Sequence, residues 1–278
     1  MSVIDRLAYG VKHILELDIA GPDLVYYPDD TFVVSYPESG NTWSRFLISN
    51  LLQSDPALTL LDVERLIPSV NNQTRGFFKG MPRPRVIGDH GSFNPQYKNV
   101  IYIVRDPRDV VIADYNSFVL KSGIVKSGTG DDSYPITKYV NEFMRGARPG
   151  VGSWGENVAS WLATRGNSPR FLLLRYEDMV SETARELGKV ASFLGMQVSA
   201  DRLAEAVNRS SSDNMRKLEK MQGDKWAQNK QVTGGWQSIL PKPAVAEIES
   251  AWGPLMAKLG YELSTLQAVE TGAVNAAF

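Results

Sequence analysis

Apolar residues along this chain fall into short continuous runs and longer runs with helical spacing, and the two kinds alternate. Short runs rich in β-branched and aromatic residues predict three buried strands: Thr31 to Ser35, Val100 to Val104 and Phe171 to Leu174. Apolar positions with a helical period predict three helices: Thr42 to Gln53, Val110 to Leu120 and Pro243 to Leu259. Strands that alternate with helices are typical of a parallel sheet covered on both faces. We therefore expect a three-layer α/β/α fold with a mostly parallel central sheet.

The chain of 278 residues has the length of one large domain, and no internal repeat or low-complexity tract divides it. We expect a single domain over 1–278, with a helical extension at 1–25 and a frayed tail at 265–278. Stretches with Gly, Pro or Ser and few periodic apolar residues predict three long connections: Arg75 to Pro84, Lys121 to Pro135 and Asp224 to Pro243.

Apolar residues near the start also recur at helical spacing: Val3, Ile4, Leu7, Val11, Ile14 and Leu15. This stripe fits a helix packed on the domain, and it also fits a helix in weak contact with a membrane surface. Its shortness and the small number of Lys and Arg residues beside it favour the packed helix. No secretory leader pattern and no run approaching ~18 apolar residues occurs, so we expect a cytoplasmic location.

Charge and cysteine content narrow the classes of function. Thirty basic residues against 31 acidic ones give a formal net charge of -1, so nucleic acid is not an expected partner and any anion site must be local. The absence of cysteine excludes a disulfide framework, a thiolate metal site and a cysteine nucleophile. No His and carboxylate cluster has the spacing of metal ligands, so no metal is expected.

The first predicted strand runs into the loop Tyr36-Pro37-Glu38-Ser39-Gly40-Asn41-Thr42-Trp43, which opens the first predicted helix. A glycine loop in this position directs backbone N–H groups and the positive end of the helix at one point, where an anion is the natural ligand. A purely structural turn has the same pattern. The usual nucleoside-triphosphate loop ends in Gly-Lys-Ser/Thr and is not matched.

Read with four later segments, this loop resembles the phosphosulfate loop of the cytosolic-type sulfotransferase family, usually Tyr-Pro-Lys-Ser-Gly-Thr-Thr-Trp. The other segments resemble the family's motifs in the same order: Val100 to Val110 (Val-Ile-Tyr-Ile-Val-Arg-Asp-Pro-Arg-Asp-Val), Gly152-Ser153-Trp154 with Trp161, Leu172 to Met179 (Leu-Leu-Leu-Arg-Tyr-Glu-Asp-Met), and Lys230 to Trp236. The resemblance covers about Thr31 to Gly260. It implies a P-loop-like fold and transfer of a sulfuryl group from 3'-phosphoadenylyl sulfate (PAPS), which leaves as the desulfated nucleotide PAP. The acceptor is a hydroxyl of a small molecule, glycan or lipid, no metal takes part, and the oligomeric state stays open.

The resemblance also implies roles for single residues. In the nucleotide site these are Ser39, Gly40, Asn41 and Thr42 around the 5'-phosphosulfate, Trp43 stacked on adenine, Arg105 on the 3'-phosphate, Tyr176 near adenine, and Lys230 in the C-terminal loop. A core tryptophan and a surface ion pair are the alternatives for Trp43 and Arg105. His90 follows Val86-Ile87-Gly88 where the family has its catalytic histidine, and a neutral imidazole can take a proton from a hydroxyl. A capped loop histidine is the alternative, and His13 is expected to be structural.

The chain departs from the family at several nucleotide-binding positions. Glu38 replaces the loop lysine, Ala113 a serine, Ser212 an aromatic, Asn229 an arginine and Gln231 a glycine. Five cations are candidates to restore positive charge, with ordinary solvated side chains as the alternative: Arg45, Lys79, Arg83, Arg85 and Arg108. Two other functions stay open, a nucleotide-binding relative without turnover and a kinase with a degenerate loop. The kinase lacks a loop lysine and a magnesium-binding carboxylate at the expected places.

Overall fold

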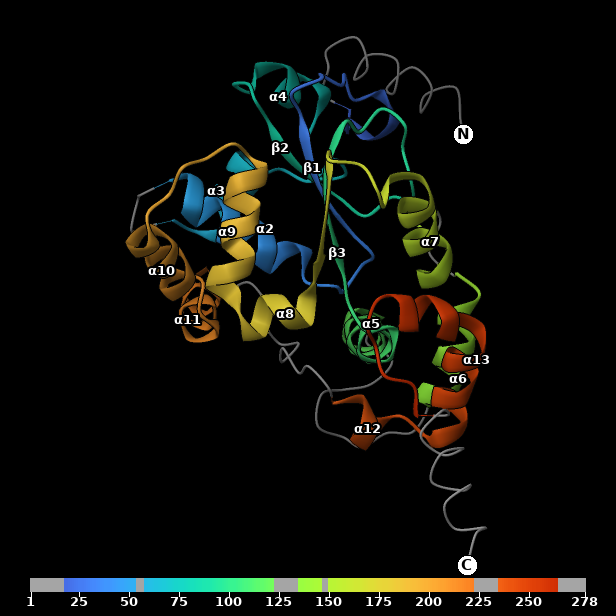
Figure 1. Ribbon diagram of the computed structural model, residues 1–278. Helices are drawn as coiled ribbons and strands as arrows, with labels where there is room; N and C mark the ends of the chain where they lie inside the picture. Colours follow the sequence, from blue (N-terminus) through green and yellow to red (C-terminus); the bar gives the residue numbers. More distant parts are fainter. Residues whose placement is uncertain (1–17, 54–57, 123–134, 147–149, 223–234, 265–278) are drawn as a thin grey trace, which may run out of the picture.

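Four parallel strands form the central sheet of the computed structural model, which describes residues 18–53, 58–122, 135–146, 150–222 and 235–264. The strands are β1 (Thr31–Ser35), β2 (Val86–Asp89), β3 (Asn99–Val104) and β4 (Phe171–Arg175), in the order β2-β1-β3-β4 (Figure 1). The three predicted strands are confirmed to within one residue. β2 was not predicted as a strand, because two of its four residues are Gly88 and Asp89, which are rare in strands.

Side chains of β1 alternate between two hydrophobic clusters, with Phe32 and Val34 on one face and Val33 on the other. The Val33 face is covered by α2 (Asn41–Leu52), α3 (Leu60–Leu66), α9 (Thr183–Phe193) and α10 (Ala200–Arg209). The opposite face is covered by α5 (Pro107–Ser122), α6 (Ile136–Met144), α7 (Trp154–Arg165) and α13 (Lys242–Lys258), and Figure 1 shows the two groups on either side of the sheet. The predicted three-layer fold is confirmed.

Shorter elements join these layers: η1 (Gly21–Asp23), α4 (Arg75–Gly80), α8 (Tyr176–Ser181), α11 (Ser212–Gln222) and α12 (Trp236–Ile239). The prediction of a connection from Arg75 to Pro84 was wrong in its first half, because Thr74 accepts a hydrogen bond from the Phe77 amide and starts α4 there. The predicted connection over 224–243 likewise contains α12 and the start of α13.

Several predictions fall on residues outside the described ranges. These are the helix at residues 3–15, most of the connection at 121–135, and the tail at 265–278. Among the helices that the structure does describe, none combines the length and the apolar character needed to cross a bilayer. The single-domain assignment stays a prediction.

The starts of the helices explain which backbone donors remain available. α3 and α7 each begin with a capping box, Thr59 with Asp62 and Ser153 with Glu156. At the start of α2, by contrast, Gly40 is the N-cap and makes no side-chain cap. The first N–H groups of a helix have no partner within the helix, so the start of α2 keeps donors for another group.

Candidate functional site

All of the described residues predicted for the site follow the carboxyl ends of the four strands. Because the strands are parallel, these ends share one edge of the sheet. The loop with Ser39 follows β1, His90 follows β2, Arg105 follows β3 and Tyr176 follows β4. β2 pairs with one side of β1, and the next strand along the chain, β3, pairs with its other side. Ligands of α/β proteins bind where the strand order reverses in this way.

The loop after β1 is shaped by Gly40 and its contact with Tyr176. Gly40 has a φ of 92°, and a Cβ atom there would lie 2.5 Å from both Cδ2 and Cε2 of the Tyr176 ring. Only glycine fits this backbone conformation and this approach. Beside it, the Ser39 hydroxyl is fully buried and has no hydrogen-bond partner among the described residues. A buried polar atom of this kind usually has a partner, so it marks a place for a polar ligand.

Asn41 and Thr42 are the first two residues of α2. The Asn41 amide donates to the carbonyl oxygens of Val33, at 3.0 Å, and Asp89, at 3.3 Å, and so ties the start of α2 to β1 and β2. Its side chain is therefore used inside the protein, and its backbone N–H is the group at the helix start. Thr42 is half-buried in the first turn of α2.

Arg105 is almost fully buried and lies against the loop after β1. It is 6% exposed, its Nη1 donates to the Glu38 carbonyl oxygen at 2.8 Å, and its Cζ lies 4.7 Å from the centre of the Tyr176 ring. On the other side, the indole N–H of Trp154 donates to the Arg105 carbonyl oxygen at 3.1 Å. The guanidinium thus joins the loop after β1 to the residues after β3 and β4.

Trp43 and Tyr176 are both packed inside the protein. Trp43 is 9% exposed, its indole N–H donates to the Ser210 carbonyl oxygen at 2.9 Å, and its ring meets the Tyr176 ring edge-on with 5.9 Å between centres. Tyr176 is 1% exposed, and burial raises the pKa of its phenol, which therefore stays protonated at neutral pH. Stacking of Trp43 on adenine stays a prediction.

His90 is held in one tautomer by β1. Its Nδ1 lies 2.9 Å from the carbonyl oxygen of Ser35, an atom that can only accept, so Nδ1 carries the proton. The lone pair of the neutral ring is then on Nε2, which is the nitrogen able to accept a proton. Two side chains of α7 fix the main chain here, since Asn157 donates to the His90 carbonyl at 3.1 Å and Trp161 to the Gly91 carbonyl at 3.0 Å.

Sequence reasoning missed Ser35 and Asn157 as partners of the histidine. Asn157 lies three residues after the Gly152-Ser153-Trp154 segment, so its place on the first turn of a helix was readable. Its contact with His90 was not, because 67 residues separate the two.

Four of the five cations considered as sources of positive charge for the nucleotide site are paired with carboxylates instead. Arg45 is buried and paired with Glu64, and Arg83 pairs with Asp29 at the surface. Arg85 forms a bidentate pair with Asp30, and both side chains are almost fully buried. Arg85 directly precedes β2 and Asp30 directly precedes β1, so this pair lies at the opposite edge of the sheet. The remaining candidates are Lys79, which is exposed on α4, and Arg108, which is also buried and paired. Lys230, which the resemblance assigns to the C-terminal loop of the nucleotide site, lies outside the described residues.

Across the described ranges, no group of three or more His, Cys, Asp or Glu residues is arranged to hold a metal ion. The carboxyl edge carries hydrogen-bond donors, the Arg105 guanidinium and the His90 imidazole, beside the carboxylates of Glu38, Asp106 and Glu177. The donors suit an anionic ligand, and the imidazole suits a proton transfer.

Comparison with known proteins gives matches over most of the chain. A model of the sulfotransferase domain matches residues 28–260. Sulfotransferase 1E1 of Homo sapiens is 28% identical over 210 residues, which are 68% of this chain and 67% of the relative. Sulfotransferase 2A6 of Rattus norvegicus is 32% identical over 200 residues, 68% of this chain and 67% of the relative. The chain thus spans about two thirds of the length of these relatives.

Solved structures show the same fold. Mouse sulfotransferase SULT7A1 complexed with PAP superimposes with a TM-score of 0.66 at 21% identity, covering 87% of this chain and 89% of that one. A putative steroid sulphotransferase of Arabidopsis thaliana gives a TM-score of 0.61 at 23% identity, covering 91% and 83%. Together with the domain match over 28–260, these similarities show that the chain belongs to the cytosolic-type, PAPS-dependent sulfotransferase family.

Proposed function

We propose that this protein transfers a sulfuryl group from PAPS to a hydroxyl of a small-molecule acceptor, with His90 as general base. The observation that carries the proposal is the hydrogen bond from His90 Nδ1 to the Ser35 carbonyl, which leaves Nε2 as the proton acceptor beside the anion loop. A base within reach of the acceptor hydroxyl and donors aimed at the anion are the two requirements of such a transfer.

The residues around the loop fit the phosphate groups of PAPS. The orphaned Ser39 hydroxyl, the uncapped start of α2 and the Arg105 guanidinium are donors that face the same edge of the sheet. Backbone N–H groups at a helix start bind phosphate, and a guanidinium binds it through two parallel hydrogen bonds. Ser39 and the first turn of α2 hold the 5' end of the nucleotide, and Arg105 its 3'-phosphate.

In this reaction the protein accepts a proton and stabilises the negative charge of the transferred group. PAPS supplies the sulfuryl group and leaves as PAP. Nε2 of His90 takes the proton of the acceptor hydroxyl as the oxygen bonds to sulfur, and the bond from sulfur to the phosphate oxygen breaks. The Ser35 carbonyl then hydrogen-bonds to an imidazolium ring whose orientation has not changed.

Relatives support a small apolar alcohol as acceptor. A 3-alpha-hydroxysteroid sulfotransferase of Cavia porcellus is 29% identical over 209 residues, and the fold matches a retinol dehydratase in complex with androsterone and PAP at a TM-score of 0.66. Androsterone and retinol are therefore the first acceptors to test, and a glycan and a longer-chain lipid alcohol complete the panel.

Calorimetric titration with PAP tests the nucleotide half of the proposal. The expected result is one site per chain with a dissociation constant (Kd) on the order of micromolar, the common scale for such ligands. Transfer of labelled sulfate from PAPS to an acceptor of the panel tests the other half. A protein that shows no heat signal and no protection against thermal unfolding with PAP contradicts the proposal.

A nucleotide-binding protein without turnover is the second candidate, and Glu38 favours it. Glu38 is half-buried in the anion loop with a φ of 62°, and no ion pair involving its carboxylate occurs within the described ranges. A carboxylate at this point repels the 5' end of the nucleotide. PAP binding with no labelled product on any acceptor would support this candidate.

Replacing Glu38 with lysine should tighten PAP binding roughly 30-fold, since the substitution changes the charge by two units and each unit charge about 4 Å from another contributes about 1 kcal/mol even in water. Glu38→Gln removes only the repulsion and is expected to give about half of the gain in free energy. Both variants keep an unbranched side chain at the same backbone conformation, so calorimetry compares charge alone. Unchanged affinity in both would mean that the Glu38 carboxylate points away from the anion.

A further inference from the structure

Arg108 lies near the site, and all three nitrogens of its guanidinium donate to other parts of the protein. It lies in the first turn of α5, with a side chain only 3% exposed. Its Nε and Nη2 donate to the two carboxylate oxygens of Asp106 at 2.9 and 2.7 Å, and its Nη1 donates to Glu249 of α13 at 2.6 Å. Nη2 also donates to the Glu262 carbonyl at 2.9 Å. These partners come from three separate parts of the chain.

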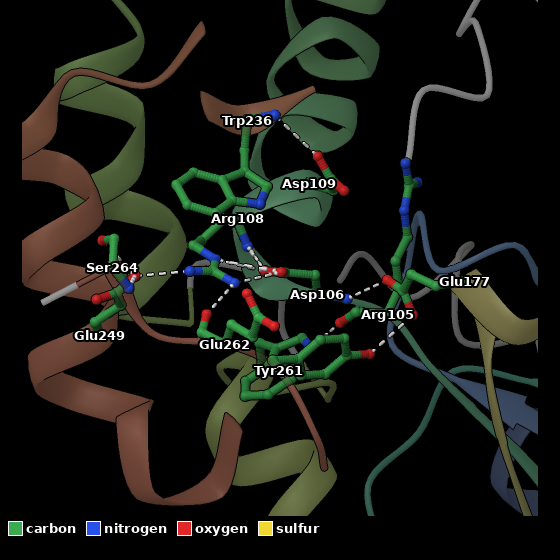
Figure 2. Close-up of polar contacts among 11 residues, drawn as sticks. Arg105, Asp106, Arg108, Asp109, Glu177, Trp236, Glu249, Tyr261, Glu262 and Ser264 are labelled. Atoms are coloured by element: carbon green, nitrogen blue, oxygen red, sulfur yellow. Dashed lines mark hydrogen bonds and ion pairs between the residues drawn. The ribbon is translucent and has the colours of Figure 1, made fainter. Parts of the chain in front are cut away.

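The face of the Arg108 guanidinium is also covered. Its Cζ lies 3.9 Å from the centre of the Trp236 ring, and the Trp236 amide donates to Asp109 at 3.2 Å (Figure 2). A planar guanidinium stacks on an indole in a way that an ammonium group does not. Arg108 and Asp109 together hold the first residue of α12 on the start of α5.

The same network continues to the adenine side of the site. The amide of Asp106 donates to Glu177 at 2.9 Å, and the Tyr261 hydroxyl donates to the other Glu177 oxygen at 3.1 Å, as Figure 2 shows. Burial raises the pKa of Glu177, although both oxygens accept hydrogen bonds. Glu177 directly follows Tyr176, whose ring lies beneath Arg105. Asp106 directly follows Arg105.

The network is not sealed inside the core. It forms part of the wall of a cavity of about 780 Å³, which is lined by Asp106, Arg108, Glu177, Trp236 and Tyr261 among others. Burial alone would lower the pKa of Arg108, but its hydrogen bonds and charge interactions with Asp106 and Glu249 raise it above the usual value. The side chain stays charged, and its two carboxylate partners leave no positive charge for a phosphate.

We propose that Arg108 is a positioning residue for the nucleotide: it locks Asp106 and Trp236 in place and thereby sets the geometry of Arg105 and Tyr176 without touching the ligand. This inference rests on the proposed function. It assigns the second arginine of the Arg105-Asp106-Pro107-Arg108 segment a different task from the first, which is the phosphate ligand. It also explains why α12 and the segment after α13 are bonded to the start of α5.

The test is Arg108→Lys, which keeps the charge but loses the bidentate pair and the stacking on Trp236. We expect the Kd for PAP and the KM for PAPS to rise roughly 10- to 100-fold, because small displacements of a binding group cost that much. The KM for the acceptor and kcat should change by less than about threefold, since His90 is held by β1 and α7 instead.

Arg85→Lys is the matched control. Arg85 is equally buried and is bidentate to Asp30, but it lies at the opposite edge of the sheet. The Arg85→Lys variant should lower the melting temperature, as Arg108→Lys does. It should leave the Kd for PAP within about twofold of wild type, because distant sites act independently. Trp236→Ala removes the same stacking contact from the other partner. The double variant should therefore bind PAP less than about twofold more weakly than Arg108→Lys alone.

Two outcomes would overturn the inference while the proposed function stands: PAP affinity unchanged in both Arg108→Lys and Trp236→Ala, or PAP affinity weakened equally in Arg108→Lys and Arg85→Lys. The second result would mean that Arg108 acts only through global stability. A wild-type protein that does not bind PAP overturns the proposed function and this inference with it.

Discussion

Replacing His90 with alanine should lower kcat by roughly 10²- to 10⁴-fold, the usual contribution of a positioned general base. The imidazole is the group whose lone pair is directed by the Ser35 carbonyl, and the acceptor hydroxyl would otherwise have to lose its proton to water. The Kd for PAP should stay within about twofold, because no nucleotide contact is removed. Labelled-sulfate transfer measures the first quantity and calorimetry the second.

The chain offers a matched control, since it contains only one other histidine, His13. His13→Ala should keep the wild-type rate at every pH. The wild-type rate should fall as pH drops below the range where imidazole is neutral, and the residual rate of His90→Ala should lack that step. If the His90→Ala variant keeps the full rate, or loses PAP affinity together with the rate, His90 is not the general base.

Gly40→Ala is expected to weaken PAP binding at least about 30-fold, which corresponds to about 2 kcal/mol. Two costs add: a non-glycine residue at a φ of 92° is strained by about 1–3 kcal/mol, and overpacking typically costs another 1–3 kcal/mol. The new methyl group would lie 2.5 Å from two carbons of Tyr176, so the loop or the ring must move. Either movement changes the start of α2, where we propose that the 5' end of the nucleotide binds.

Gly195→Ala separates backbone strain from the contact with Tyr176. Gly195 has a φ of 71°, follows α9, and has no atom within 4 Å of its would-be Cβ. The Gly195→Ala variant should lower the melting temperature and leave PAP affinity unchanged. Equal affinity losses in the two variants would show that the Gly40 effect is one of stability and not of the loop.

Local sequence patterns were sufficient for three strands of the sheet and for the strand-loop-helix unit around Gly40. The strands β1 and β3 are largely apolar runs because both of their faces are covered, and such runs are visible without any tertiary information. β4 is also an apolar run, although it lies at the edge of the sheet and Leu173 is 36% exposed. β2 and α4 were missed as elements. β2 has four residues including Gly88, and α4 is a single short helix whose start depends on Thr74. Short elements gain most of their stability from packing, which a local pattern does not record.

The roles of the arginines could not be predicted from sequence. Each charge was visible, but the partner of each was not: Arg45 meets Glu64, Arg85 meets Asp30, and Arg108 meets a glutamate 141 residues away. A buried guanidinium without a carboxylate would be costly, so these pairs follow from burial, and burial is a property of the fold. Arg45, Arg85 and Arg108 were candidates to restore charge to the nucleotide site, with ordinary solvated side chains as the alternative, and the structure instead shows each of them buried and paired with a carboxylate.

The sequence by itself determined the alternation of strands and helices, the strand-loop-helix unit around Gly40, and the residues that follow each strand. Tertiary structure decided which of those residues act together. Parallel pairing brings the ends of β1 to β4 to one edge, the Ser35 carbonyl selects the tautomer of His90, and Arg108 joins α5 to α12 and α13. The reason is physical: periodicity and propensity act over a few residues, whereas hydrogen-bond partners are set by packing between distant segments.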